Sequence, residues 1–224
     1  MERKFQFSIN EYYHIYNRGV EKRDIFMSGD DYLRFQRMLY VANSTKPVVY
    51  KLIQRQSLDT INIGDKIVAI GAYCLMPNHF HILVKEVQEN GVTDFMEKLS
   101  TGHSKYFNKK YERVGALFQG RFKAEHVDSD EYLKYLYSYI HLNPVKLIDP
   151  TWKEAGIRDT KKTRAYLENY HTSSYPDYLG VDREEKLILT KKEFPEYFDK
   201  PKDFKEYIND WLEFVKNGGS PKHQ

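Results

Sequence analysis

A pair of histidines is the first feature of this sequence that suits chemistry. The stretch MPNHFHILVKE (76–86) places His79 and His81 two residues apart at the start of an apolar run. Alternate side chains of a β-strand point to opposite faces, so the two imidazoles share one face and the apolar residues share the other. Neutral imidazole is the commonest protein ligand for a metal ion. The pattern predicts a metal site on the polar face, although two packed or solvated histidines would give the same spacing.

A tyrosine and an amide form the second feature. In YSYIHLNPVK (137–146), Tyr139 and Asn143 are four residues apart and therefore lie on one helix face, about one turn from each other. Asn143 can offer its side-chain oxygen to a metal held by the histidines, with Tyr139 beside the same ion. Tyr135, one turn further back, is the main competitor as a nucleophile. The alternative from spacing alone is that Tyr139 packs in the core and Asn143 caps the helix.

The elements that must position these residues alternate as strands and helices. We expect a strand over 11–19, a helix over 28–43, an irregular stretch with possible short strands over 44–66, strands over 66–76 and from His79 onward, a helix over 92–114, a strand over 121–127 and a helix over 128–143. This is an α+β chain in the ferredoxin-like βαββαβ order, with an added helix that carries the tyrosine. Two helices would cover one face of an antiparallel sheet and leave the histidine face open. Residues 150–224 read as a loop-rich and helical extension with a last amphipathic helix over 202–217.

Composition limits the class of protein. The chain has 224 residues, of which 41% are apolar, and its single cysteine, Cys74, excludes an intramolecular disulfide and a cysteine-based zinc cage. The N-terminus has no apolar signal region, and no apolar run approaches the ~20 residues of a membrane span. We therefore expect a soluble, cytoplasmic protein with no membrane partner.

Charge is concentrated in one segment. Residues 98–123 carry seven positive side chains against one negative side chain, a local balance of +6. Such a segment favours a phosphate-bearing partner, and the alternative is a solvated helix face. Tyrosine and phenylalanine beside basic residues can also stack on unpaired bases.

Five blocks of this sequence resemble a known family. PNHFHILV (77–84) resembles the His-hydrophobic-His (HUH) motif of single-tyrosine transposases, and YIHLNPVK (139–146) resembles the tyrosine helix of the REP-associated tyrosine transposases. YNRG (16–19), YFNKKYERVGALFQGRFK (106–123) and SSYPDYLG (173–180) are similar to that branch in type and order. The resemblance covers about residues 10–180. NPVKLID departs slightly from relatives that have small residues after the Lys or Arg, which affects a turn rather than the chemistry.

This resemblance implies both roles and a reaction. His79 and His81 take the places of the metal-binding histidines, Tyr139 that of the nucleophile and Asn143 that of the third ligand. The implied enzyme is a metal-dependent transposase and endonuclease that cleaves and rejoins single-stranded or hairpin DNA, such as REP-like repeats, through a 5′-phosphotyrosine. Its cofactor would be Mg²⁺ or Mn²⁺. The expected DNA contacts are Arg18, Lys105, Lys109, Lys110, Arg113, Arg121 and Lys123.

Domain boundaries and the oligomeric state can also be predicted, and two alternative functions stay open. We expect a catalytic domain over 1–148 and a helical and loop extension over 149–224 packed on it. The protein would be a monomer or a homodimer, with a site completed within one chain favoured by the short connection before the tyrosine helix. One rival is a domesticated nucleic-acid-binding protein without cleavage. The other is a metal-dependent phosphodiesterase that uses water as its nucleophile.

Overall fold

A four-stranded antiparallel sheet lies at the centre of the molecule. The computed structural model describes residues 6–217 and 219, so the outer ends of the two expected domains, at 1–5, 218 and 220–224, lie outside the described residues. The strands are β1 (Tyr12–Arg18), β2 (Val68–Met76), β3 (His79–Glu86) and β4 (Lys123–Val127). They are ordered β2-β3-β1-β4, and each pairs antiparallel with its neighbour. The α+β class and the antiparallel sheet are therefore confirmed.

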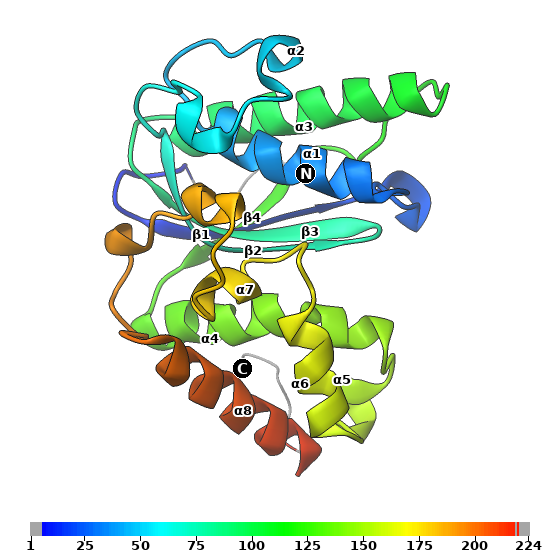
Figure 1. Cartoon of the computed structure of the whole chain (residues 1–224), viewed down its shortest axis with the longest axis vertical. Helices are drawn as coiled ribbons and strands as arrows, with labels where there is room; N and C mark the ends of the chain where they lie inside the picture. The colour runs from blue at the N-terminus through cyan, green and yellow to red at the C-terminus, as the bar shows by residue number, and fades with distance from the viewer. Residues whose placement is uncertain (1–5, 218, 220–224) are drawn as a thin grey trace.

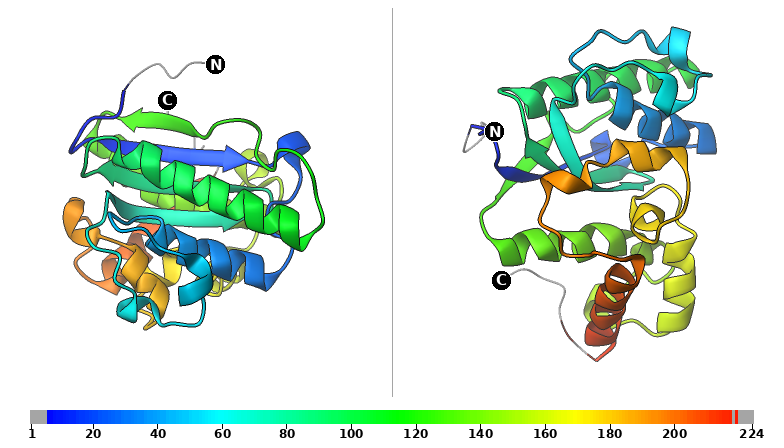
Figure 2. Two further views of the ribbon diagram at one scale, coloured as in Figure 1. Left: turned by 90° about the horizontal axis from the view of Figure 1, so that it is seen from above. Right: turned by 60° about the vertical axis from the view of Figure 1, so that its left-hand side comes forward.

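Helices cover both faces of the sheet, which gives three layers (Figure 1). One layer holds α1 (Gly29–Val41) and α3 (Gly91–Lys110), and α3 crosses the strands obliquely (Figure 2). The opposite layer holds α4 (Asp130–Leu142), α5 (Trp152–Ala155), α6 (Thr160–Glu168), α7 (Tyr175–Tyr178) and α8 (Pro201–Lys216). The expectation that the histidine face stays open is therefore wrong. All nine residues of β2 are buried, and a strand that is apolar at both odd and even positions needs cover on both sides.

Two segments differ from the expected elements. Residues 44–66 contain a short helix, α2 (Tyr50–Ile53), and a 3₁₀ turn at Leu58–Thr60, where short strands were considered. Helix α3 ends at Lys110 rather than near residue 114, because the backbone then turns through positive φ at Glu112 and Gly115. Neither conformation can continue a right-handed helix.

Helix α4 forms where capping residues predict it. The Ser129 hydroxyl accepts a hydrogen bond from the Tyr132 N–H at 3.2 Å, and two acidic residues follow in the first turn, where they complement the helix dipole. The helix ends at Leu142, and Pro144 lies in the 3₁₀ turn Asn143–Leu147 that follows. Its apolar side packs on the sheet and on α8, which fixes the direction in which Tyr139 points.

The segment after α6 attaches the second helical layer to the sheet. The Ser174 N–H donates to the Tyr73 carbonyl, and the Tyr73 N–H donates to the Ser174 hydroxyl, both at 2.9 Å. Arg183 pairs with the buried Asp177 and donates to the carbonyl oxygens of His171 and Ser173. Within the described residues, no helix combines the length and apolar character needed to cross a bilayer.

Candidate active site

The sheet gathers polar side chains on the face that carries α4. In the register of β1 and β3, His79 lies opposite Arg18 and His81 lies opposite Tyr16, so all four side chains share that face. Phe80 points the other way and its ring packs against Phe35 of α1 at 5.2 Å. The two imidazoles lie 5.1 Å apart between ring centroids and are nearly perpendicular. The division between an apolar and a histidine face follows the predicted alternation.

His79 presents one free ring nitrogen. The Asn78 amide donates to the Lys22 carbonyl at 3.1 Å, which orients its oxygen toward His79 Nδ1 at 2.7 Å. Nδ1 therefore carries the proton, and Nε2 keeps its lone pair with no hydrogen-bond partner among the described residues. Burial, followed by the charges of Lys146, Lys153 and Arg18, lowers the pKa of His79 to about 4. The ring is neutral at pH 7.

His81 is buried and has a histidine partner. Its Nδ1 lies 2.9 Å from His14 Nε2 on the neighbouring strand β1, and the two rings stack. Burial, followed by the nearby His14 and His79, lowers the pKa of His81 well below its ordinary value. Its Nε2 has no hydrogen-bond partner among residues 6–217.

Tyr139 lies directly beside this pair. Its ring centroid is 5.5 Å from that of His81 and 5.6 Å from that of His14, and both contacts are close to perpendicular. Its hydroxyl has no hydrogen-bond partner in the described part of the chain. Burial, with a smaller contribution from Glu125, raises the pKa of the phenol. Tyr139 is thus a half-buried side chain with an uncommitted hydroxyl and not a fully packed core residue.

Asn143 is oriented by the same helix. Its amide nitrogen donates to the Tyr139 carbonyl at 2.7 Å, so its side-chain oxygen is left without a hydrogen-bond partner among the described residues. The competing Tyr135 packs its ring against Trp211 at 5.4 Å and Tyr139 at 5.9 Å. Of Tyr135 and Tyr139, Tyr139 is therefore the one in ring contact with His81.

These donors fit a divalent ion. Two neutral imidazoles with free Nε2 atoms and one free amide oxygen are a borderline-hard ligand set that suits Mn²⁺ or Mg²⁺. No group of three or more histidine, cysteine or acidic side chains that could hold a metal occurs among the described residues. A metal at this place would therefore depend on Asn143 or on ligands from outside the chain.

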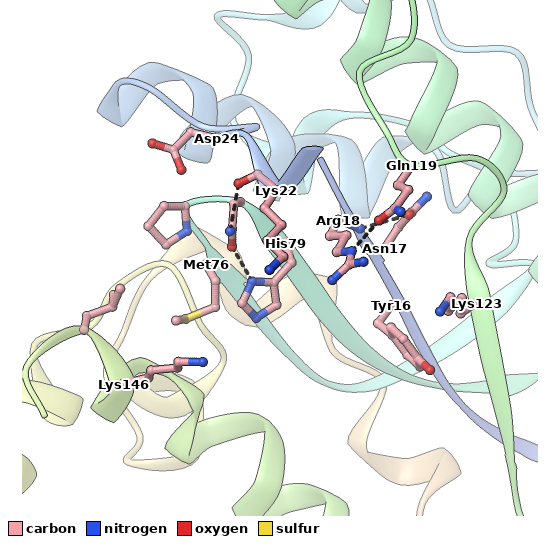
Figure 3. A pocket seen from close by; sticks show the side chains of 13 residues that line it. Tyr16, Asn17, Arg18, Lys22, Asp24, Met76, His79, Gln119, Lys123 and Lys146 are labelled. Carbon is pink, nitrogen blue, oxygen red and sulfur yellow. Dashed lines mark hydrogen bonds between the residues drawn. The ribbon is translucent and has the colours of Figure 1, made fainter. Parts of the chain in front are cut away.

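A cationic pocket of about 690 Å³ opens beside His79 (Figure 3). Figure 3 shows His79 with Arg18 on one side and Lys146 on the other, and Tyr16 and Lys123 further along β1 and β4. The charged residues in its lining are Arg18, Lys22, Asp24, Lys123 and Lys146. Met76, Pro77 and Leu147 add apolar surface. The pocket thus offers both cations for phosphate groups and a surface for bases.

The other basic residues predicted to bind DNA lie elsewhere. Lys105 and Lys109 are exposed on α3, in the layer on the far side of the sheet, and Arg121 is exposed just before β4. Arg113 donates to the Asn108 side chain at 3.0 Å. Lys110 forms an ion pair of 2.7 Å with the fully buried Asp31. Of the seven predicted contacts, Arg18 and Lys123 line the pocket.

Three side chains near the site were not predicted. His14 bonds to His81, and Glu125 of β4 lies opposite His14 in the sheet register. Strand alternation in YYHIYNR could have placed His14 on the histidine face, but the pairing of β1 with β3 and β4 was needed to bring it to His81. Lys153 of α5 lies with its Nζ 4.8 Å from the centroid of the Tyr139 ring, and no local pattern indicates that contact.

Comparisons with known proteins identify the region that holds these residues. Residues 60–143 match the family model described as "Transposase IS200 like", a range that contains His79, His81, Tyr139 and Asn143. A solved structure of a REP-associated tyrosine transposase bound to a REP hairpin is similar in fold, with a TM-score of 0.50 and 12% sequence identity over 83% of this chain and 90% of that chain. No curated protein matches the chain.

Proposed function

We propose that this chain, whose residues 60–143 match the family model described as "Transposase IS200 like", cleaves and rejoins single-stranded DNA with Tyr139 as the nucleophile. One observation carries the proposal. A tyrosine whose hydroxyl has no hydrogen-bond partner in the described part of the chain lies 5.5 Å, ring to ring, from a neutral, buried histidine whose Nε2 is likewise without a partner there. A purely structural tyrosine has no need of that neighbour.

His79 and His81, through Nε2, and Asn143, through its side-chain oxygen, are the residues that would hold the divalent ion. When bound, a Mg²⁺ or Mn²⁺ ion supplies Lewis-acid stabilisation of negative charge on the scissile phosphate. The lowered pKa of His79, about 4, supports this role because the ring needs no deprotonation at neutral pH.

The chemical step is a transesterification. The Tyr139 oxygen loses its proton and forms a bond to phosphorus, the bond from phosphorus to the 3′-oxygen breaks, and that oxygen takes up a proton. The products are a 5′-phosphotyrosine and a free 3′-hydroxyl. The new ester retains the energy of the original one, so the reverse attack rejoins the strand without ATP.

The substrate is a single strand beside a hairpin, such as a REP-like repeat. The solved relative of similar fold is described as bound to a REP hairpin. In this chain, the pocket cations Arg18, Lys123 and Lys146 would contact phosphates, and Tyr16 offers a ring on which a base can stack. Lys105, Lys109, Arg113 and Arg121 stay candidate contacts for the hairpin stem.

The architecture suits such a role. The strand order β2-β3-β1-β4, with α1 and α3 on one face, is the ferredoxin-like arrangement, and α4 is the added helix. We assign the catalytic domain to residues 1–148 and treat 149–224 as an extension that supports α4. Both histidines and Tyr139 come together within one chain, so a monomer already contains every proposed catalytic group.

The test is covalent capture on a hairpin oligonucleotide with a single-stranded flank. With Mn²⁺, the wild-type protein should form an adduct that survives a denaturing gel. Tyr139→Phe removes one oxygen that has no hydrogen-bond partner among the described residues, so it should bind the oligonucleotide equally well and form no adduct.

The matched control is Tyr135→Phe, which should form the adduct. Adduct that persists in Tyr139→Phe and disappears in Tyr135→Phe would identify the wrong tyrosine. Cleavage by Tyr139→Phe with free 5′-phosphate ends would support a phosphodiesterase, and binding without cleavage by the wild type would support a DNA-binding protein.

A further inference from the structure

A chain of polar contacts leads from His81 to an acidic residue on the edge strand. His81 Nδ1 lies 2.9 Å from His14 Nε2, and both side chains are buried. On the other side of the ring, His14 Nδ1 lies 3.7 Å from Glu125 Oε2. That separation is too long for a hydrogen bond, but it is short enough for the carboxylate charge to act on this nitrogen.

Glu125 is held as a hydrogen-bond acceptor. The Tyr16 hydroxyl donates to Oε1 at 2.8 Å and the Tyr132 hydroxyl donates to Oε2 at 3.0 Å. His14 and these two hydroxyls lower the pKa of Glu125 to about 2 against the opposing effect of desolvation. The group is therefore a carboxylate at neutral pH, although its side chain is half exposed.

The position of one proton on His14 then decides the state of His81. A nearby carboxylate favours the proton of a neutral imidazole on the adjacent nitrogen, which is His14 Nδ1. His14 Nε2 then has a lone pair and can only accept, so His81 Nδ1 must be the donor. This leaves the lone pair of His81 on Nε2. The opposite arrangement would put a proton on His81 Nε2 and remove that nitrogen as a ligand.

We propose that His14 and Glu125 are positioning residues that hold His81 in the tautomer protonated on Nδ1. The inference rests on the proposed role of His81 as a metal ligand, where an outer partner on the second ring nitrogen fixes both the tautomer and the ring orientation. Asn78 does the same for His79, so each histidine of the pair has its own orienting partner.

The test reads the tautomer directly, in metal-free protein. Ring ¹H–¹⁵N spectra of histidine-labelled protein, with the His81 signals assigned from a His81→Gln sample, should show the His81 proton on Nδ1 in the wild type. Glu125→Gln removes the charge from a half-exposed site and should give a mixture of both tautomers. The same variant should bind Mn²⁺ about 10- to 100-fold more weakly in calorimetry.

His14→Leu is the stronger variant, but His14 is buried, so Glu125→Gln keeps the test independent of folding. Glu11→Gln is the matched control, because Glu11 bonds to His126 Nε2 at 2.7 Å and His126 packs on Tyr13, on the other face of the sheet. It should change neither the His81 tautomer nor Mn²⁺ affinity.

A wild-type His81 protonated on Nε2, or an unchanged His81 tautomer in Glu125→Gln, would overturn the inference. Failure of the proposed function gives a different result. In that case the wild type would bind no Mn²⁺ and form no adduct, while the tautomers of His81 would still respond to Glu125→Gln.

Discussion

At the scale of single residues, Lys110 shows how a basic side chain can be committed to the fold. Asp31 is fully buried, and it accepts hydrogen bonds from Lys110, Tyr106, Tyr111 and the N–H groups of Met27 and Ser28. These bonds outweigh the cost of burial and lower the pKa of the carboxyl well below its usual range. The ammonium of Lys110 is the cation that balances this buried charge.

Lys110→Met should therefore destabilise the protein. We expect the free energy of unfolding in urea to fall by about 1–3 kcal/mol, because a buried charge loses a charged partner. Lys109→Met is the control, since Lys109 is exposed on the same helix and should change stability by less than about 0.5 kcal/mol. Equal effects in the two variants would contradict the structural role of Lys110.

The side chains of the site were easier to predict from the sequence than the role of Lys110. His79 and His81 share a face because strand alternation is a local property, and Tyr139 and Asn143 share a helix face for the same kind of reason. The ion pair between Lys110 and Asp31 joins residues 79 positions apart and depends on how α1 packs on α3. The sequence pattern within either helix therefore does not predict that contact.

At the scale of elements, α4 is fixed to the sheet by a buried hydrogen-bond chain. His141 Nδ1 donates to the Tyr137 carbonyl at 2.8 Å, so its Nε2 accepts from the Ser174 hydroxyl at 2.7 Å. The same hydroxyl accepts from the Tyr73 N–H of β2 at 2.9 Å. Tyr139 thus owes its place beside His81 partly to a segment beyond residue 170.

Ser174→Ala should weaken this attachment. The buried His141 nitrogen and Tyr73 N–H both lose a partner, so the free energy of unfolding should fall by about 1–3 kcal/mol. Ser100→Ala is the matched control, because the Ser100 hydroxyl is buried in α3 and has no hydrogen-bond partner among the residues that the structure describes. Its loss should be neutral or stabilising. Thermal unfolding of the two variants tests this prediction. A similar loss of stability in both would contradict the structural role of the hydrogen bonds made by Ser174.

Elements with strong boundary signals were predicted well, and others were not. The Ser129 cap and Pro144 set the limits of α4, and apolar alternation set β3. Helices α2, α5 and α7 are short, so they lack the several turns over which a 3.6-residue period becomes visible. Their positions are set by tertiary packing around the buried strand β2 and not by a local sequence pattern.

At the scale of the whole molecule, the proposed function leaves two basic surfaces as candidate paths for DNA. One is the pocket with Lys123 and Lys146, and the other is the exposed side of α3 with Lys105 and Lys109. If the single strand lies in the pocket, Lys123→Gln with Lys146→Gln should flatten the plot of log affinity against log salt by about 0.7 per lost phosphate contact. Lys105→Gln with Lys109→Gln should leave the slope for a short single strand unchanged, and the reverse result would move the strand to α3.

Histidine burial predicts how stability depends on pH. Burial is the main cause of a lowered pKa in all four of these residues: His79 and His103 to about 4, His141 to about 3 and His81 well below its usual value. On unfolding, each returns to an ordinary value near ~6.5, so the unfolded chain binds more protons between about pH 6.5 and 4. The stabilising contribution is complete above that window and is lost as pH falls through it.

The melting temperature should therefore drop as pH is lowered from about 6.5 to 4. His103→Gln should reduce the steepness of that drop, because its ring is buried against the Ile25 carbonyl, whereas His171→Gln, at an exposed residue, should not. A melting temperature that stays constant across the window would contradict the prediction. The carboxylates of Asp31 and Glu125, whose pKa values are also lowered, add their own loss at lower pH.

The hydrogen bonds between Ser174 and Tyr73 of β2 also determine when, during synthesis, the site can be completed. A ribosome makes the histidines of β3 early and α4 later, and it adds Ser174 and Arg183 only after both. A nascent chain therefore contains every proposed catalytic side chain before it contains the residues that press the tyrosine helix onto the sheet. On the proposed function, a nascent chain would gain the ability to cleave DNA only late in synthesis, after the segment that contains Ser174 has been made and can hold α4 on the sheet.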